Sequence, residues 1–159
     1  MSLDGDIALL KRVPLFGDLP TEQLRLIAFS AVRLDLLAGQ VLFRDGDRGM
    51  SGYVVSSGAL ELTVRNGERK EVVAVCEAGS LVGEVALFVE TRRPATAIAA
   101  KPSQVLEIER KLVTRMLNEY PQIALGLRAT LADRLSATVS ELGRVRDALM
   151  RIDRLQPRR

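Results

Sequence analysis

The hydrophobic pattern divides the chain into helical ends and a middle of short strands. Before residue 31, apolar residues recur at helical spacing, which predicts a short amphipathic helix over 6–12 and a second helix that begins at Pro20. Proline suits the first helical position because its missing N–H would be unpaired there anyway. Leu24, Ile27 and Ala28 lie on one face of this second helix, so that face is expected to be buried.

From residue 31 to residue 109 the period changes to two, as in strands that alternate between two environments. Glycines separate the apolar runs, and Asn66-Gly67 predicts a hairpin turn between two of them. The fold class expected is mainly β with flanking helices, the middle forming an antiparallel β-roll (a double-stranded β-helix or jelly roll). Alternating apolar pairs support it: Val32/Leu34, Val41/Phe43, Tyr53/Val55, Leu60/Leu62/Val64 and Val73/Val75.

Helical spacing returns at Arg110, with a short helix over 110–118 and a last long helix that begins at Pro121. The long helix carries a heptad seam formed by Leu131, Leu135, Thr138, Leu142, Val145, Leu149 and Ile152. Because so narrow a seam suits a partner helix, we expect a homodimer through this helix. The chain is thus predicted to be one domain over 1–159: helices over 1–30, a roll over 31–109 and helices over 110–159.

Composition excludes several functions. The chain of 159 residues contains no histidine, so histidine-based triads, relays and zinc sites are excluded. No Walker loop or dinucleotide fingerprint occurs, and we expect no enzymatic activity and no cofactor. The single cysteine, Cys76, ends an apolar strand; it indicates a reducing compartment and is expected in the core rather than in redox chemistry. With no leader pattern and no apolar run as long as a membrane span, a cytoplasmic location without membrane contact is expected.

The positive charge is concentrated at the C-terminal end of the sequence. Residues 141–159 contain six arginines and three acids, which accounts for the net charge of +3. A nucleic acid or a lipid surface is one interpretation of such a segment. A solvated helix face is favoured, since no aromatic residues are interspersed and no groove-reading element is recognisable. Direct DNA binding is therefore not expected.

The chemistry of interest lies between residues 79 and 97. Gly83 precedes a short helical pattern over Glu84–Phe88, whose first N–H groups and dipole suit an anion. Glu84 is able to accept hydrogen bonds from sugar hydroxyls, and Arg93 offers donors that match phosphate oxygens. Taken singly, Glu84 is equally explained as a carboxylate complementing the helix dipole and Arg93 as half of a surface ion pair.

Taken together, these residues resemble the phosphate-binding cassette of the cyclic nucleotide-binding domain family. The matching segments are Gly83-Glu84-Val85-Ala86-Leu87 and Arg93-Pro94-Ala95-Thr96, and Gly39 to Asp47 and Leu15 to Leu19 are also similar to family patterns. The resemblance implies that Glu84 holds the ribose 2′-hydroxyl and that Arg93 binds the cyclic phosphate. It also implies that amides at Gly83 to Ala86 and at Ala95 contact the phosphate, with Thr96 and Thr138 on the base side.

Two residues leave alternatives open. Pro94 has no N–H to offer a phosphate, a loss of about 1.5–3 kcal/mol, and no hydroxyl of the kind that favours cGMP; cAMP is therefore the expected ligand over cGMP. Thr138 either contacts the base or sets the register of the seam. The alternative to a nucleotide sensor is a scaffold that retains the roll and the dimerisation helix but binds no ligand.

Overall fold

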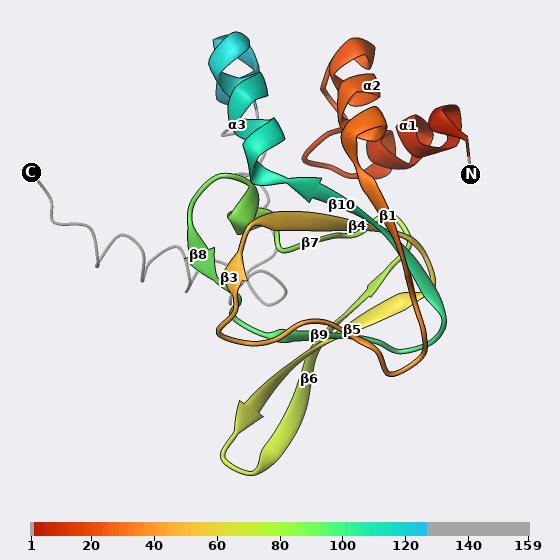
Figure 1. Cartoon of the computed structure of the whole chain (residues 1–159), viewed down its shortest axis with the longest axis vertical. Helices are drawn as coiled ribbons and strands as arrows, with labels where there is room; N and C mark the ends of the chain where they lie inside the picture. The colour runs from red at the N-terminus through yellow and green to blue at the C-terminus, as the bar shows by residue number, and fades with distance from the viewer. Residues whose placement is uncertain (1, 127–159) are drawn as a thin grey trace, which may run out of the picture.

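The computed structural model describes residues 2–126 and places three helices at one end of a β-roll (Figure 1). The helices are α1 (Leu3–Arg12), α2 (Thr21–Ser30) and α3 (Arg110–Glu119), and a 3₁₀ turn, η1 (Glu84–Leu87), lies within the β region. The strands are β1 (Val32–Leu36), β2 (Val41–Phe43), β3 (Arg48–Gly49), β4 (Ser51–Ser57), β5 (Ala59–Asn66), β6 (Arg69–Glu77), β7 (Leu81–Val82), β8 (Thr91–Arg92), β9 (Thr96–Ala99) and β10 (Ser103–Glu109).

Two four-stranded antiparallel sheets form the roll. One has the order β1-β10-β4-β7 and the other the order β2-β9-β5-β6, while β3 and β8 pair separately. The side chains between the two sheets form one apolar core, made of Leu36, Phe43, Tyr53, Val55, Leu60, Val82, Ala97, Ala99 and Val105. The predicted mainly β fold with flanking helices is confirmed.

The sheet that contains β4 is buried on both faces. Val55 faces the other sheet, whereas Val54 packs in a second core with helix residues such as Leu10, Leu24 and Met116. The molecule therefore has three layers, helices, sheet and sheet, and the first five residues of β4 are all buried because both faces of the strand are covered there.

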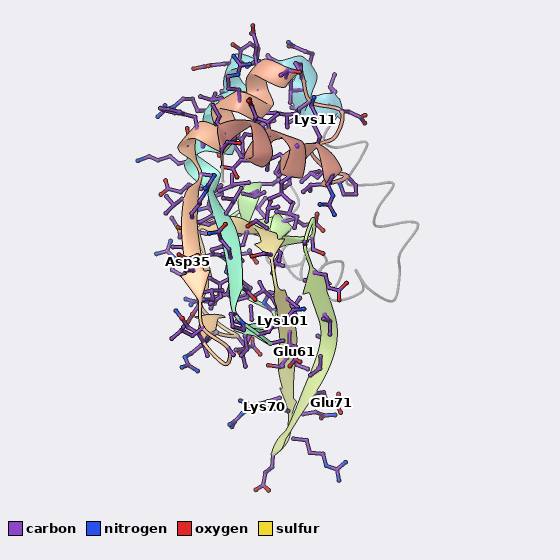
Figure 2. The ribbon with its side chains drawn as sticks, turned by 90° about the vertical axis from the view of Figure 1, so that its right-hand side faces the viewer. Lys11, Asp35, Glu61, Lys70, Glu71 and Lys101 are labelled. Carbon is purple, nitrogen blue, oxygen red and sulfur yellow. The ribbon has the colours of Figure 1, made fainter. Side chains whose placement is uncertain are left out.

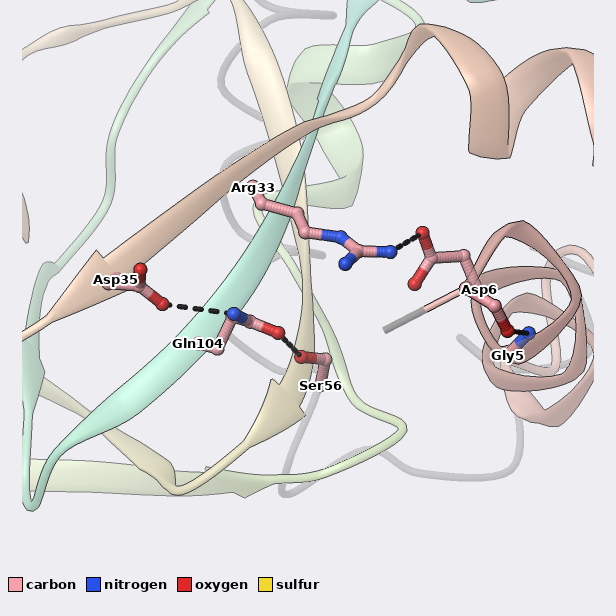
Figure 3. Close-up of polar contacts among 7 residues, drawn as sticks. Gly5, Asp6, Arg33, Asp35, Ser56 and Gln104 are labelled. Atoms are coloured by element: carbon pink, nitrogen blue, oxygen red, sulfur yellow. Dashed lines mark hydrogen bonds and ion pairs between the residues drawn. The ribbon is translucent and has the colours of Figure 1, made fainter.

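A polar network crosses the helix side of this sheet (Figure 3). Asp35 on β1 accepts a hydrogen bond from Gln104 on β10, which in turn accepts one from Ser56 on β4. Arg33, also on β1, forms an ion pair with the buried Asp6 of α1. The ion pair fixes the first helix to the edge strand of the roll.

Several local expectations need correction. The first helix begins at Leu3 rather than residue 6, because the Ser2 hydroxyl accepts from the Gly5 N–H and caps it. Pro20 is the N-cap of α2, not its first helical residue. The Asn66-Gly67 hairpin is confirmed, but it projects beyond the roll, with Lys70 and Glu71 near its tip (Figure 2).

The projecting hairpin changes the environment of the residues on β6. Val73 and Val75, one of the alternating pairs that predicted the roll, do form a strand, but both side chains are exposed among the described residues. Cys76, expected in the core, is half-buried and packs at the margin of the roll interior. Helical structure resumes over residues 121–126 as predicted, whereas the heptad seam and Thr138 lie outside the described residues.

The turn between β4 and β5 is a tightly packed joint. Gly58 has φ +83°, and a Cβ there would lie 2.1 Å from the Ser103 hydroxyl. That buried hydroxyl accepts from the Ala59 N–H at 3.0 Å and donates to the Lys101 carbonyl at 2.7 Å, which joins two turns of the roll.

Gly58→Ala should destabilise the protein far more than Gly39→Ala, as measured by urea unfolding. Gly39 has φ +84° but open space around a Cβ, so its substitution costs only the left-handed backbone strain of about 1–2 kcal/mol. Gly58→Ala adds displacement of Ser103 and an unpaired Ala59 N–H, about 1–3 kcal/mol more. Equal losses in the two variants would show that the joint is not tightly packed.

Candidate functional site

A cavity of about 60 Å³ opens between the two sheets beside η1. It is lined by seven of the predicted site residues: Gly83, Glu84, Val85, Ala86, Arg93, Pro94 and Ala95. Phe43, Leu62 and Val82 complete much of its apolar wall. The structure therefore brings Glu84 and Arg93 to one cavity, although they are nine positions apart in sequence and Arg93 lies in the loop between β8 and β9.

Gly83 allows the chain to turn into η1. It adopts the left-handed conformation, with φ 76° and ψ 33°, and the Ala86 N–H donates back to its carbonyl. A Cβ at this position would lie 2.4 Å from Nη1 of Arg93. Glycine is thus required both by the backbone conformation and by the close approach of the arginine.

Arg93 is held by its backbone and by one end of its side chain. Its N–H donates to the Asp47 carbonyl at 2.7 Å, and its carbonyl accepts from the Gly46 N–H at 2.8 Å. Its Nη2 donates to the Ser51 carbonyl at 2.7 Å. The side chain passes beside Gly49, where a Cβ would lie 3.4 Å from both Nε and Cζ.

The charge of Arg93 is buried, and within the described part of the chain it has no paired carboxylate. The residue is 4% exposed, and its Nε and Nη1 have no hydrogen-bond partner within residues 2–126. The two ion pairs in this part of the chain, Arg33–Asp6 and Arg48–Glu90, do not include it. Burial lowers the pKa of Arg93, an effect opposed by the surrounding Tyr53, Glu107 and Asp47. An arginine stays protonated at neutral pH, so the site presents a positive charge with unpaired donors.

Two aromatic rings lie over the guanidinium. The Cζ of Arg93 is 4.4 Å from the centroid of the Phe43 ring and 5.4 Å from that of the Tyr53 ring. The two rings are 5.8 Å apart and inclined by 31°. Burial and the Glu107 carboxylate on the paired strand raise the pKa of Tyr53 to about 12, so this ring is neutral at physiological pH.

The position of Thr96 on β9 does not fit its predicted role on the base side of the ligand. Alternation along β9 buries Ala95 and Ala97 toward the roll interior and turns Thr96 outward. Its hydroxyl accepts from the Asp45 N–H at 2.9 Å, and it lines a separate hollow on the outer face with Thr63 and Ile98. Thr96 therefore supports the loop before β3 and does not contact the cavity. Thr138 lies outside the described residues.

Sequence reasoning missed the other contacts of Arg93. Phe43 lies within the motif Gly39 to Asp47, but the motif does not indicate that this side chain contacts the arginine. No motif close in sequence includes Tyr53. Ser51 contributes its main-chain carbonyl, which no side-chain pattern reveals. Within residues 2–126, no three potential metal ligands cluster, and no helix is long and apolar enough to cross a membrane.

The family model described as "Cyclic nucleotide-binding domain" matches residues 33–120. The chain belongs to the cyclic nucleotide-binding domain family. The match includes the cassette residues and the aromatic residues around Arg93, and therefore most of the lining of the cavity beside η1.

Similar proteins agree with this assignment. The chain is 31% identical over 134 residues to the "Cyclic AMP receptor protein" of Thermus thermophilus, an alignment that covers 84% of this chain and 62% of that protein. The N-terminal domain of a transcriptional regulator from Streptomyces coelicolor superimposes with a TM-score of 0.74 and 33% identity, over 82% of this chain and 92% of that one.

The regulatory domain of Toxoplasma gondii PKA, solved with cAMP, superimposes with a TM-score of 0.68 and 26% identity. That match covers 71% of this chain and 43% of the Toxoplasma chain. The chain thus spans less than two thirds of the length of the Thermus and Toxoplasma proteins.

Tyr53→Phe should change the alkaline stability of the protein. Because the pKa of Tyr53 is raised on folding, from the ordinary 10.0 to about 12, its stabilising contribution is present below pH 10 and is lost as pH rises through 12. Between pH 10 and 12 the free energy of unfolding should fall more steeply in the wild type than in Tyr53→Phe, by about 2–3 kcal/mol in total. Chemical unfolding at several pH values across this range measures the free energy of unfolding of both proteins, with Tyr120→Phe as the matched control. The prediction is contradicted if the free energies of the wild type and Tyr53→Phe fall in parallel.

Proposed function

We propose that the protein is a sensor domain that binds a cyclic mononucleotide, cAMP, in the cavity beside η1. Arg93 binds the cyclic phosphate, Glu84 holds the ribose 2′-hydroxyl, and the amides at Gly83 to Ala86 and at Ala95 contact the phosphate. The observation that carries the proposal is the buried Arg93 guanidinium, which lines the cavity with two nitrogens that have no hydrogen-bond partner in the described part of the chain.

The unpaired donors favour an anionic ligand on energetic grounds. A buried N–H without an acceptor costs about 1–3 kcal/mol, and more when the group is charged. A phosphate would satisfy such donors through charge-assisted hydrogen bonds, which are about twice as strong as neutral ones. Gly83, Glu84, Val85 and Ala86, at the start of η1, line the same cavity wall, so the positive end of its local dipole lies beside the cavity.

The choice of cAMP over cGMP depends on Pro94. This residue lines the cavity next to Arg93 and offers neither an N–H to the phosphate nor a hydroxyl to a guanine base. The relatives point the same way, since one is named a cyclic AMP receptor protein and another was solved with cAMP. Pro94 should weaken the affinity by one or two hydrogen bonds without closing the site.

Signalling would pass to the C-terminal helices. The N–H of Arg110, the first residue of α3, donates to the Met50 carbonyl, and Met50 precedes the Ser51 carbonyl that holds Arg93. A ligand that moves Arg93 would therefore act directly on the segment that anchors α3. The homodimer, formed through the heptad seam beyond residue 126, and the cytoplasmic location remain parts of this proposal.

Arg93→Ala should abolish or strongly weaken cAMP binding in titration calorimetry of the full chain. Losing two charge-assisted hydrogen bonds, each worth about 1.5–3 kcal/mol, corresponds to at least a hundredfold rise in Kd. Arg48→Ala is the matched control, because this substitution also removes one positive charge, but from β3. There the Arg48 side chain is exposed and pairs with Glu90. An unchanged isotherm for Arg93→Ala would contradict the assignment.

The ligand-free scaffold remains the second candidate, and the missing N–H of Pro94 is the observation in its favour. It predicts no heat with millimolar cAMP or cGMP, no nucleotide-dependent rise in Tm, and a stable dimer by sedimentation analysis. Binding of cAMP with a rise in Tm would eliminate it.

A further inference from the structure

The position of Arg93 poses a physical problem that the hydrogen bonds do not solve. A cation that is 4% exposed has lost most of its hydration, and one main-chain carbonyl, that of Ser51, is its only hydrogen-bond partner among the described residues. Burying a charge is costly unless the surroundings replace the lost water. A carboxylate would do so, but it would also occupy the donors that a phosphate needs.

The rings of Phe43 and Tyr53, here called the aromatic pair, supply the missing compensation. Their distances of 4.4 Å and 5.4 Å from the Arg93 Cζ are within the range in which an aromatic face attracts a cation. This attraction to the rings uses neither Nε–H nor Nη1–H of Arg93, although the Tyr53 hydroxyl also interacts with the guanidinium. The cation is therefore stabilised while its donors at Nε and Nη1 stay unpaired.

The aromatic pair also restricts the orientation of the guanidinium. Phe43 comes from β2 in one sheet and Tyr53 from β4 in the other, so the two rings are fixed by the two halves of the roll. Gly83 and Gly49 leave room for the side chain at its edges, and the Ser51 carbonyl fixes Nη2. The two ring centroids are only 5.8 Å apart, so the rings lie next to one another rather than on opposite faces of the guanidinium. Together with the anchor at Nη2 they limit the rotation of the group.

We propose that Phe43 and Tyr53 are positioning residues that hold the Arg93 guanidinium in its anion-binding orientation in place of an acidic side chain. For the ligand, this inference rests on the proposed function of the site. For the arrangement of Arg93 itself, it does not, because the aromatic pair acts on the protein without nucleotide as well.

The first experiment needs no ligand. In ¹H–¹⁵N spectra of the full chain, the Nε–H signal of Arg93, identified by its loss in Arg93→Lys, should be shifted upfield by the Phe43 ring. Phe43→Leu should abolish this shift, and Phe43→Tyr, which restores an aromatic face, should retain it. Leu60→Val serves as the control, since Leu60 belongs to the same core but does not line the cavity. An Arg93 signal that is unchanged in Phe43→Leu would overturn the proposal.

The second experiment measures the Kd for cAMP in the same variants. Removing one aromatic face should weaken binding by about 3- to 30-fold in Phe43→Leu and in Tyr53→Leu, whereas Phe43→Tyr and Tyr53→Phe should stay within about twofold of the wild type. A general loss of packing would weaken binding in Leu60→Val as well, and equal losses in that control would overturn the positioning role. If the wild type binds no cAMP, the proposed function fails, and the Arg93 signal still decides the role of the aromatic pair.

Discussion

A single buried cation determines how the centre of this roll is built. Arg93 is enclosed between the two sheets, and among the described residues it has no paired carboxylate. Its burial is tolerated because a main-chain carbonyl accepts from one nitrogen and two neighbouring aromatic rings lie close to the guanidinium. Each of these groups is polar or polarisable without carrying a negative charge, so the positive potential of the site is preserved rather than neutralised.

The close approach of the backbone follows from the same constraint. Gly49 and Gly83 lie on either side of Arg93, and side chains at these positions would contact its guanidinium. At Gly49 a Cβ would also lie 2.9 Å from the Cβ of Ala86, so η1 is brought close to β3 only because both positions are small. The cavity is therefore formed by the absence of side chains as much as by the residues that line it.

The sequence predicts this site better than it predicts the environment of the site. The spacing of Glu84 and Arg93 is local, and alternation correctly predicts a roll that brings them together. Alternation past Ala95 also turns the next residue, Thr96, away from the roll interior. The family resemblance alone did not reveal this orientation. The aromatic pair escaped prediction because Phe43 and Tyr53 are 50 and 40 positions from Arg93, and only sheet pairing brings them together.

Val73 and Val75 have the alternating pattern of a half-buried strand but lie exposed on the projecting hairpin. The hydrophobic period of a strand predicts its two faces but not which other elements pack on them.

The absence of a competing carboxylate bears directly on Pro94. In a site where the arginine is paired with an acid, a ligand must first break that ion pair, and part of its binding energy is spent on doing so. Within residues 2–126, the guanidinium of Arg93 donates to the Ser51 carbonyl and leaves Nε and Nη1 unpaired, so in the proposed complex these donors would meet a phosphate without that cost. The hydrogen bond missing at Pro94 is worth about 1.5–3 kcal/mol. In the proposed complex, an Arg93 that has no ion pair to break would offset a loss of this size, because hydrogen bonds between charged groups fall in the same range. The proline alone is therefore insufficient to infer that the site has lost its ligand.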